Sequence, residues 1–133
     1  MKNLLIACVM TASLWLAVPV AAHHSMTGFD RQHPITLNGT VKSFSWQNPH
    51  CYIELDVPGK NGEVVTWNIE MTAPGYLVRA GWKKTDVKPG DKVTVVAAPL
   101  FNGQAGALFD SITLPDGEKL TQRGREAVAA KAQ

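Results

Sequence analysis

The residues best suited to chemistry are two adjacent histidines, His23 and His24, near the start of the chain. If a protease cuts the chain before His23, the new α-amine and the His23 imidazole can clamp one metal ion. One further imidazole then completes a site of three nitrogens, which favours Cu(II). Cleavage one residue earlier makes Ala22 the first residue and His24 the third. In that product an amine, two amide nitrogens and an imidazole suit Cu(II) or Ni(II) in a square plane. The histidine pair therefore predicts copper binding at a processed terminus.

The segment before these histidines has the three parts of a secretory signal peptide. Lys2 gives a positive start, residues 4–18 form an apolar run, and the small residues Val20 and Ala22 suit signal peptidase. The run is shorter than the roughly 20 residues of a membrane-spanning helix, which disfavours an uncleaved anchor. We therefore predict a signal peptide at 1–22 and a periplasmic or secreted protein with no stable membrane insertion after cleavage.

The rest of the chain predicts a small all-β domain that positions these groups. Alternating apolar and polar residues, separated by turns rich in glycine and proline, are typical of strands. A segment entered by proline and stopped by glycine predicts one short helix between the third and fourth strands. The strands are expected at 35–46, 52–57, 64–71, 92–97 and 107–114, and the helix between 72 and 81. This order is that of a five-stranded OB-fold-like barrel, with a small open sandwich as the alternative.

The same pattern sets the expected domain boundaries. An N-terminal arm at 23–34 precedes the barrel at 35–120, and a tail at 121–133 is too poor in large apolar residues to add to a core. We expect this tail to be flexible or a frayed helix. Within the long first strand, Gly39 is expected to mark a bulge or a sharp bend.

The charge pattern argues against a nucleic-acid-binding protein, and the cysteine content argues against a fold held by disulfides. The chain has 13 Lys and Arg residues against 11 Asp and Glu residues, and the basic residues are scattered. Because phosphate binding needs a basic stripe, we expect no nucleic-acid partner. Cys51 is the only cysteine after the predicted cleavage, so the mature chain cannot form an internal disulfide.

His50 is the expected additional metal ligand. It follows Asn48 and Pro49 between the first two strands, where OB-fold loops commonly bind ligands. Pro49 stiffens this turn. An arm of about ten residues, at roughly 3.3 Å each, is long enough to bring His23 and His24 back across a small barrel. The alternative for His50 is an ordinary hydrogen-bonded role.

A second hypothesis needs no metal. Trp46 and Trp67, with Asn48 in the adjoining loop, would form a face that recognises a small ligand or an envelope protein. Packing in the core is the alternative for both tryptophans, and a polar terminus without a ligand is the alternative for the histidines. No carboxylate pair, nucleophile motif or phosphate loop indicates a reaction, so the sequence favours a binding protein over an enzyme.

Six short segments together resemble a family of small exported bacterial proteins, domain of unknown function 6152. They are His23-His24-Ser25, Leu37–Val41, Trp46–His50, Gly81-Trp82, Lys88–Asp91 and Leu114–Gly117. The resemblance covers nearly the whole mature chain and implies an exported one-domain barrel, without an established activity or catalytic residues.

The leading hypothesis is therefore a periplasmic OB-fold protein that carries or sequesters copper. His23 would supply the amine and imidazole, and His24 or His50 would complete the site. The expected partner is an envelope protein or a protein of metal trafficking, and no cofactor other than copper is expected.

Overall fold

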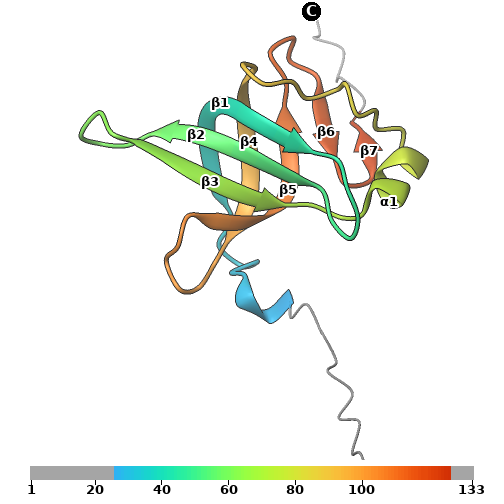
Figure 1. The fold of residues 1–133 in the computed structure, drawn as a ribbon. Coiled ribbons are helices and arrows are strands. Elements are labelled where there is room, and N and C mark those ends of the chain that lie inside the picture. Colours follow the sequence, from blue (N-terminus) through green and yellow to red (C-terminus); the bar gives the residue numbers. More distant parts are fainter. Residues whose placement is uncertain (1–25, 127–133) are drawn as a thin grey trace, which may run out of the picture.

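Five strands close into a ring in the computed structural model, which describes residues 26–126 (Figure 1). They are β1 (Ile35–Ser45), β2 (Tyr52–Pro58), β3 (Val64–Glu70), β4 (Lys92–Pro99) and β5 (Gly106–Thr113). β1 pairs with β2 and β4, β2 pairs with β3, and β4 pairs with β5, all antiparallel. A parallel pairing of β3 with β5 closes the ring. This connectivity confirms the predicted OB-fold-like barrel.

Alternation along each strand separates the core from the outer face. In β2, Ile53 and Leu55 are fully buried, whereas Tyr52 and Glu54 lie on the outside and are half-buried. The other strands of the barrel and the short helix also contribute fully buried side chains. The largest of these are Val41, Ile69, Leu77, Val95 and Ile112, and Met71 joins them from the position just after β3. The barrel interior is therefore a packed core rather than a ligand cavity.

β1 changes partner along its length, pairing first with β4 and then with β2. A Cβ atom on Gly39 would lie 2.6 Å from the Asp56 carbonyl oxygen, so glycine allows β2 to approach here. The register shift that marks a bulge lies between Val41 and Ser43. Gly39 is thus the point of close approach, and the bulge predicted as one possibility there occurs further along the strand.

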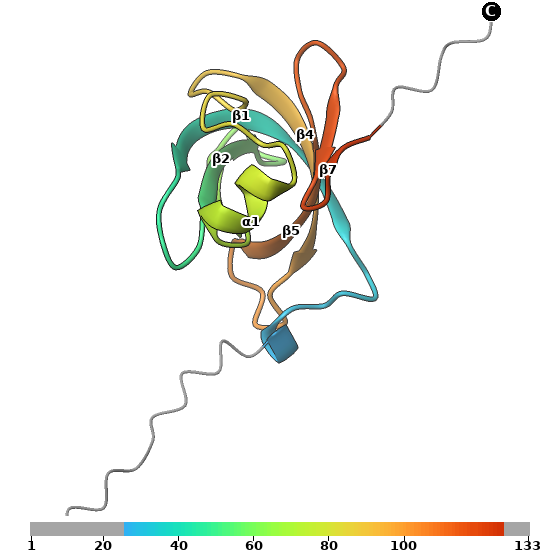
Figure 2. The ribbon, with the colours of Figure 1, turned by 90° about the vertical axis from the view of Figure 1, so that its right-hand side faces the viewer.

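α1 (Pro74–Arg79) covers one end of the barrel (Figure 2). Its only fully buried side chain is Leu77. Pro74 begins the helix, and Gly81 follows it with a φ of +84° that favours glycine. The helix is shorter than predicted at both ends, because Ala73 is still extended and Ala80 has already left the helical conformation. Neither α1 nor η1 (Met26–Gly28), the two helices in residues 26–126, is long and apolar enough to cross a membrane.

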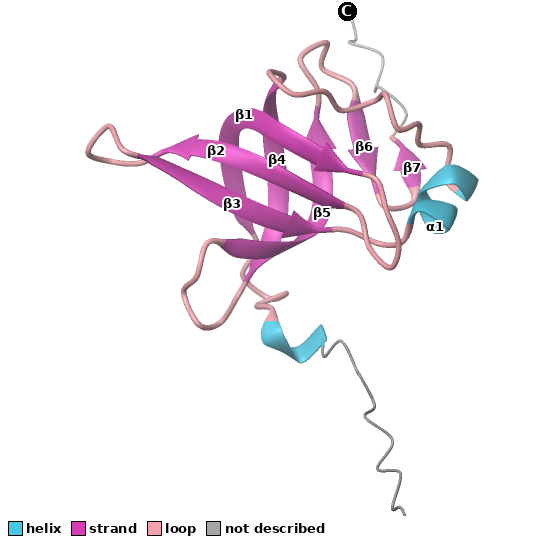
Figure 3. Cartoon of the chain, in the orientation of Figure 1, coloured by secondary structure: helices cyan, strands magenta, loops and turns pink. Residues whose placement is uncertain are grey.

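The prediction of a flexible tail is wrong for residues 121–126. β6 (Lys119–Thr121) pairs with the second half of β5, and β7 (Gly124–Arg125) pairs with β6 (Figure 3). The Trp82 indole nitrogen donates a hydrogen bond of 2.7 Å to the Thr121 carbonyl. Backbone pairing, this indole, a 2.8 Å hydrogen bond from the Gln122 side chain to the Phe109 carbonyl and the ion pair of Arg125 with Asp86 hold the segment, so hydrophobic patterning does not detect it. The last part of the predicted tail, 127–133, lies outside the described residues.

Candidate functional site

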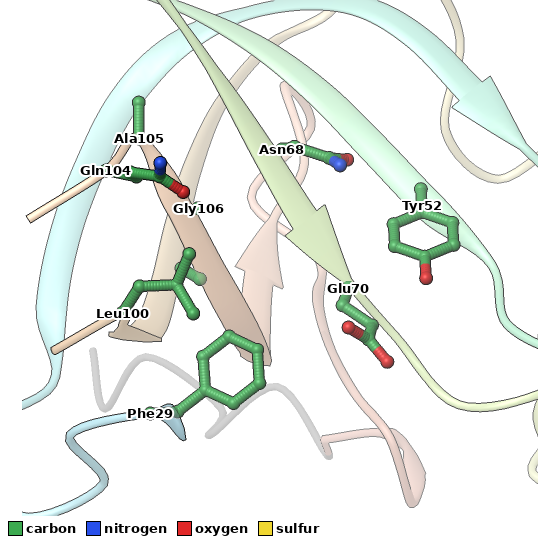
Figure 4. Close-up of a pocket in the computed structure, with 9 residues that line it drawn as sticks. Phe29, Tyr52, Asn68, Glu70, Leu100, Gln104, Ala105 and Gly106 are labelled. Carbon is green, nitrogen blue, oxygen red and sulfur yellow. The ribbon is translucent and has the colours of Figure 1, made fainter. Parts of the chain in front are cut away.

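A pocket of about 260 Å³ lies on the outside of the barrel where β2, β3 and the start of β5 meet (Figure 4). Three parts of the chain build it: the β2–β3 hairpin, the loop between β4 and β5, and the N-terminal arm. The side chains that give it its chemical character are Phe29, Tyr52, Asn68, Glu70, Leu100 and Gln104. The β2–β3 face and the β4–β5 loop are positions at which OB folds commonly bind ligands.

Strand register explains why the polar side chains meet. Tyr52 lies directly opposite Glu70 in the antiparallel β2–β3 pair, and Asn68 lies opposite Gly106 in the parallel β3–β5 pair. Because Ile69 is fully buried, its neighbours Asn68 and Glu70 point to the outer face. The backbone N–H of Asn68 also donates a 3.0 Å hydrogen bond to the Ala105 carbonyl, which attaches the β4–β5 loop to β3.

The N-terminal arm docks on the same loop. Phe29 forms an isolated antiparallel bridge with Leu100. The Asp30 amide donates to the Pro99 carbonyl at 2.8 Å, and the Phe101 amide donates to the Gly28 carbonyl at 3.0 Å. These backbone hydrogen bonds place the Phe29 ring at the edge of the pocket, beside Leu100 (Figure 4).

Glu70 connects this pocket to His50. The Nδ1 atom of His50 lies 2.6 Å from Oε1 of Glu70, and the two side chains are 25% and 22% exposed. A carboxylate on one ring nitrogen fixes the orientation of an imidazole, as is common among histidines that bind metals through the other nitrogen. The loop after β1 and the end of β3 together therefore present His50 in a defined direction.

The pKa of the Tyr52 phenol also reflects the environment of the pocket. Burial of the phenol, followed by the charge of Glu70, raises the pKa of Tyr52 above its ordinary value. The phenol therefore stays protonated and keeps its hydroxyl hydrogen at neutral pH.

Only His50 of the three predicted metal ligands lies among the described residues. His23 and His24 lie outside the described residues, whereas His50 is placed by its contact with Glu70. Within 26–126, no three His, Cys, Asp or Glu side chains are grouped closely enough to hold a metal ion. His33, in the arm, contacts Asp30 instead, with Nδ1 3.0 Å from Oδ2.

Cys51 is fully buried, although its neighbour His50 is partly exposed. Burial raises the pKa of the Cys51 thiol. These two neighbours therefore do not share a ligand site.

The predicted ligand-binding tryptophans lie on either side of β2, Trp46 just after β1 and Trp67 on β3. Trp46 packs edge-on against Phe44, with 5.5 Å between ring centroids, and Trp67 lies opposite Leu55. Both indoles are half-buried and pack against the core. Ser45, next to Trp46, pairs with Tyr52, and Trp67 pairs with Leu55, so the two tryptophans are four residues, or about 13 Å, apart along the strands. Asn48 is exposed in the loop after β1.

Sequence reasoning missed most of the pocket. Alternation alone could have placed Tyr52, Asn68 and Glu70 on one face of the hairpin. Phe29 and Gln104 could not be added, because the docking of the arm and of the β4–β5 loop depends on backbone hydrogen bonds between distant segments.

The outer face of β2 and β3 carries three carboxylates and no lysine or arginine. Besides Glu70, these are Glu54, which accepts a 2.8 Å hydrogen bond from the Ser43 hydroxyl, and Asp56, which accepts one of 2.6 Å from Thr66. Negative charge on this face opposes the binding of a phosphate backbone.

Similar folds occur among solved structures. A crystal structure of the mitochondrial single-stranded DNA-binding protein Rim1 from S. cerevisiae is 16% identical to this chain, with a TM-score of 0.48. The match covers 62% of this chain and 93% of that one. A selenomethionine-labelled Rim1 structure is 17% identical, with a TM-score of 0.42 and coverages of 62% and 92%.

Comparison with curated protein sequences gives no match. A family model, by contrast, matches residues 12–110, which is most of the chain and includes β1 to β4. It confirms the resemblance seen in the sequence motifs. The chain therefore belongs to the family of unknown function DUF6152.

Proposed function

We propose that this protein is exported and binds copper for carriage or sequestration. The amine and imidazole of His23, released by signal cleavage, would form the primary clamp, with His24 or His50 as the additional ligand. The ligand set is rich in nitrogen, and divalent copper stands at the top of the affinity order for such sites.

The observation that supports this proposal is the position of the His50–Glu70 pair beside the docked arm. Glu70 and Phe29 line the same pocket, and Glu70 contacts His50. His24 precedes Phe29 by five residues, of which three form η1 and rise only about 2.0 Å each, so the chain between them reaches roughly 13 Å. The arm therefore tethers the terminal histidines to the pocket that Glu70 lines, which is the basis for proposing His50 as their additional ligand.

Glu70 would act on the metal through His50. A carboxylate at Nδ1 makes Nε2 the nitrogen that ligates and increases its basicity, and such contacts are worth about 10–100-fold in metal affinity. His50 would then anchor the arm to the barrel when metal is bound, so that metal loading and the position of the arm are coupled.

Variants of the mature protein test the proposal. Cu(II) affinity is measured by competition with a chelator for the protein purified from an exporting host. His23→Ala is expected to abolish tight binding, whereas His33→Ala serves as the matched control because His33 lies in the same arm and pairs with Asp30. Equal affinity of the His23→Ala variant and the unmodified protein would overturn the proposal.

The pocket favours a second candidate function, a metal-free binding module for a small ligand or an envelope partner. In this candidate function the side chains that line the pocket would bind the ligand. Trp46 and Trp67 would not, because neither tryptophan lines the cavity. Deletion of residues 23–26 would leave this activity intact, whereas it would remove the proposed copper clamp.

A further inference from the structure

We propose that the pocket between the β2–β3 hairpin, the β4–β5 loop and the arm binds a primary ammonium group on a short alkyl chain, with Glu70 as the counter-charge. This proposal concerns a site formed by described residues and does not depend on copper binding.

The negative charge of Glu70 favours a positively charged ligand. Glu70 is the only Asp, Glu, Lys or Arg among the residues that line the pocket, and its side chain is 22% exposed. Partial removal from water strengthens the attraction between its carboxylate and a cation. The raised pKa of Tyr52, caused by burial and then by Glu70, agrees with a negative potential at this place. An anionic ligand would face Glu70 without a basic partner in the pocket lining.

The other polar groups suit an ammonium head. An ammonium group has three donors and no acceptor. The side-chain oxygens of Asn68, Gln104 and Tyr52 can all accept a hydrogen bond, and their residues line the same pocket as Glu70 (Figure 4). The donors of the ligand thus meet acceptors from both strands of the hairpin and from the β4–β5 loop.

Apolar groups and volume limit the rest of the ligand. Phe29 and Leu100 form an apolar wall, and the ring of Phe29 can also attract a cation through its π face. At about 260 Å³, the pocket is smaller than the 300–1,000 Å³ or so of sites for drug-sized ligands. These dimensions fit a small alkylamine or one lysine side chain.

Titrations of the mature protein in a metal chelator, followed by two-dimensional amide NMR spectra, test this inference. We expect n-butylammonium to cause saturable shifts in residues 104–107 and in Asn68 and Glu70. Butanoate, which has a similar size and the opposite charge, is expected to cause none. Equal shifts with both probes would overturn the proposal. N-acetyl-lysine methylamide distinguishes the two sources: binding as tight as that of n-butylammonium identifies a lysine side chain, and much weaker binding identifies a free amine.

Two variants show whether the pocket itself is responsible. Glu70→Gln is expected to weaken n-butylammonium binding by about tenfold or more, the usual effect of losing a hydrogen bond to a charged group. Ala105→Leu fills the pocket from the loop and leaves Glu70 in place, and it is expected to weaken binding to a similar degree. Glu54→Gln is the control, because it removes a carboxylate from the same face but outside the pocket. Retained affinity in both pocket variants, or an equal loss in Glu54→Gln, would contradict the proposed site.

Discussion

The Nδ1 atom of His50 lies 2.6 Å from Oε1 of Glu70. This contact joins the loop after β1 to the last residue of β3, and it places the one described histidine of the proposed copper site next to the pocket on which the arm docks. It also gives Glu70 two roles, because the same carboxylate orients an imidazole and faces a cavity.

Glu70→Gln is therefore expected to weaken copper binding as well as ammonium binding. Loss of the carboxylate that orients a metal-bound histidine typically costs about 10–100-fold in affinity. Chelator competition with Cu(II) measures the effect, and His50→Ala should show at least the same loss. Unchanged copper affinity in both variants would assign the additional ligand to His24 rather than to His50.

The β6–β7 segment is expected to be essential for stability. Leu120→Ala removes a fully buried side chain and should lower the free energy of unfolding by about 2–5 kcal/mol. Val64→Ala, at a position that is 63% exposed, is the control and should change it by less than about 0.5 kcal/mol. Urea denaturation monitored by tryptophan fluorescence makes the comparison. Equal effects of the two substitutions would show that the segment is not part of the cooperative core.

Gly39→Ala is expected to destabilise the barrel. A Cβ at this position would lie 2.6 Å from the Asp56 carbonyl oxygen and 2.9 Å from the Leu55 side chain. Forcing β1 and β2 apart should cost about 1–3 kcal/mol in the free energy of unfolding. Gly75→Ala, in α1, provides the matched control because its Cβ would approach no atom closer than 3.7 Å. Thermal unfolding of both variants tests the difference, and a Gly39→Ala protein as stable as the parent would refute the close approach.

Alkaline pH is expected to destabilise the fold through Cys51. Burial raises the pKa of this thiol above its ordinary value of 9.0. The unfolded state therefore releases the proton at lower pH than the folded state, so stability is complete below about pH 9 and falls as pH rises through the folded pKa. Tyr52, with a pKa raised above 10.0, adds to the loss at higher pH.

Urea midpoints between pH 8 and pH 11 measure this alkaline loss. Cys51→Ala should show a shallower decline with pH than the parent, even though its overall stability is lower because the core loses volume. An identical decline would exclude the thiol as its cause. Alkylation of the native protein gives a second readout, since a fully buried, protonated thiol should react far more slowly than in urea.

The strands could be predicted because they follow a local rule. In β2, alternation from Tyr52 to Val57 assigns each side chain to the core or to the outer face without knowledge of its partners. Pro74 and Gly81 similarly mark the helix ends. β6 and β7 are too short to show such a rule, because they have three and two residues. β6 depends on pairing with β5, and β7 on pairing with β6, beside the hydrogen bond from Trp82.

The site was less predictable for a different reason. His50 could be selected by residue type and loop position, but its partner Glu70 lies twenty positions later and is brought to it only by the register of β2 with β3. Phe29 joins the pocket through backbone hydrogen bonds of the arm, and these cannot be predicted from the type of its side chain. Trp46 and Trp67 were predicted as ligand-binding residues because of their residue type, yet both pack against the core.

Native mass spectrometry of the protein from an exporting host, with one equivalent of Cu(II) and a competing chelator, tests the central claim most directly. The account predicts a mature chain that begins at His23 and retains one copper ion. A mature chain that begins elsewhere, or one that begins at His23 but yields all of its copper to the chelator, would contradict the terminal histidine clamp.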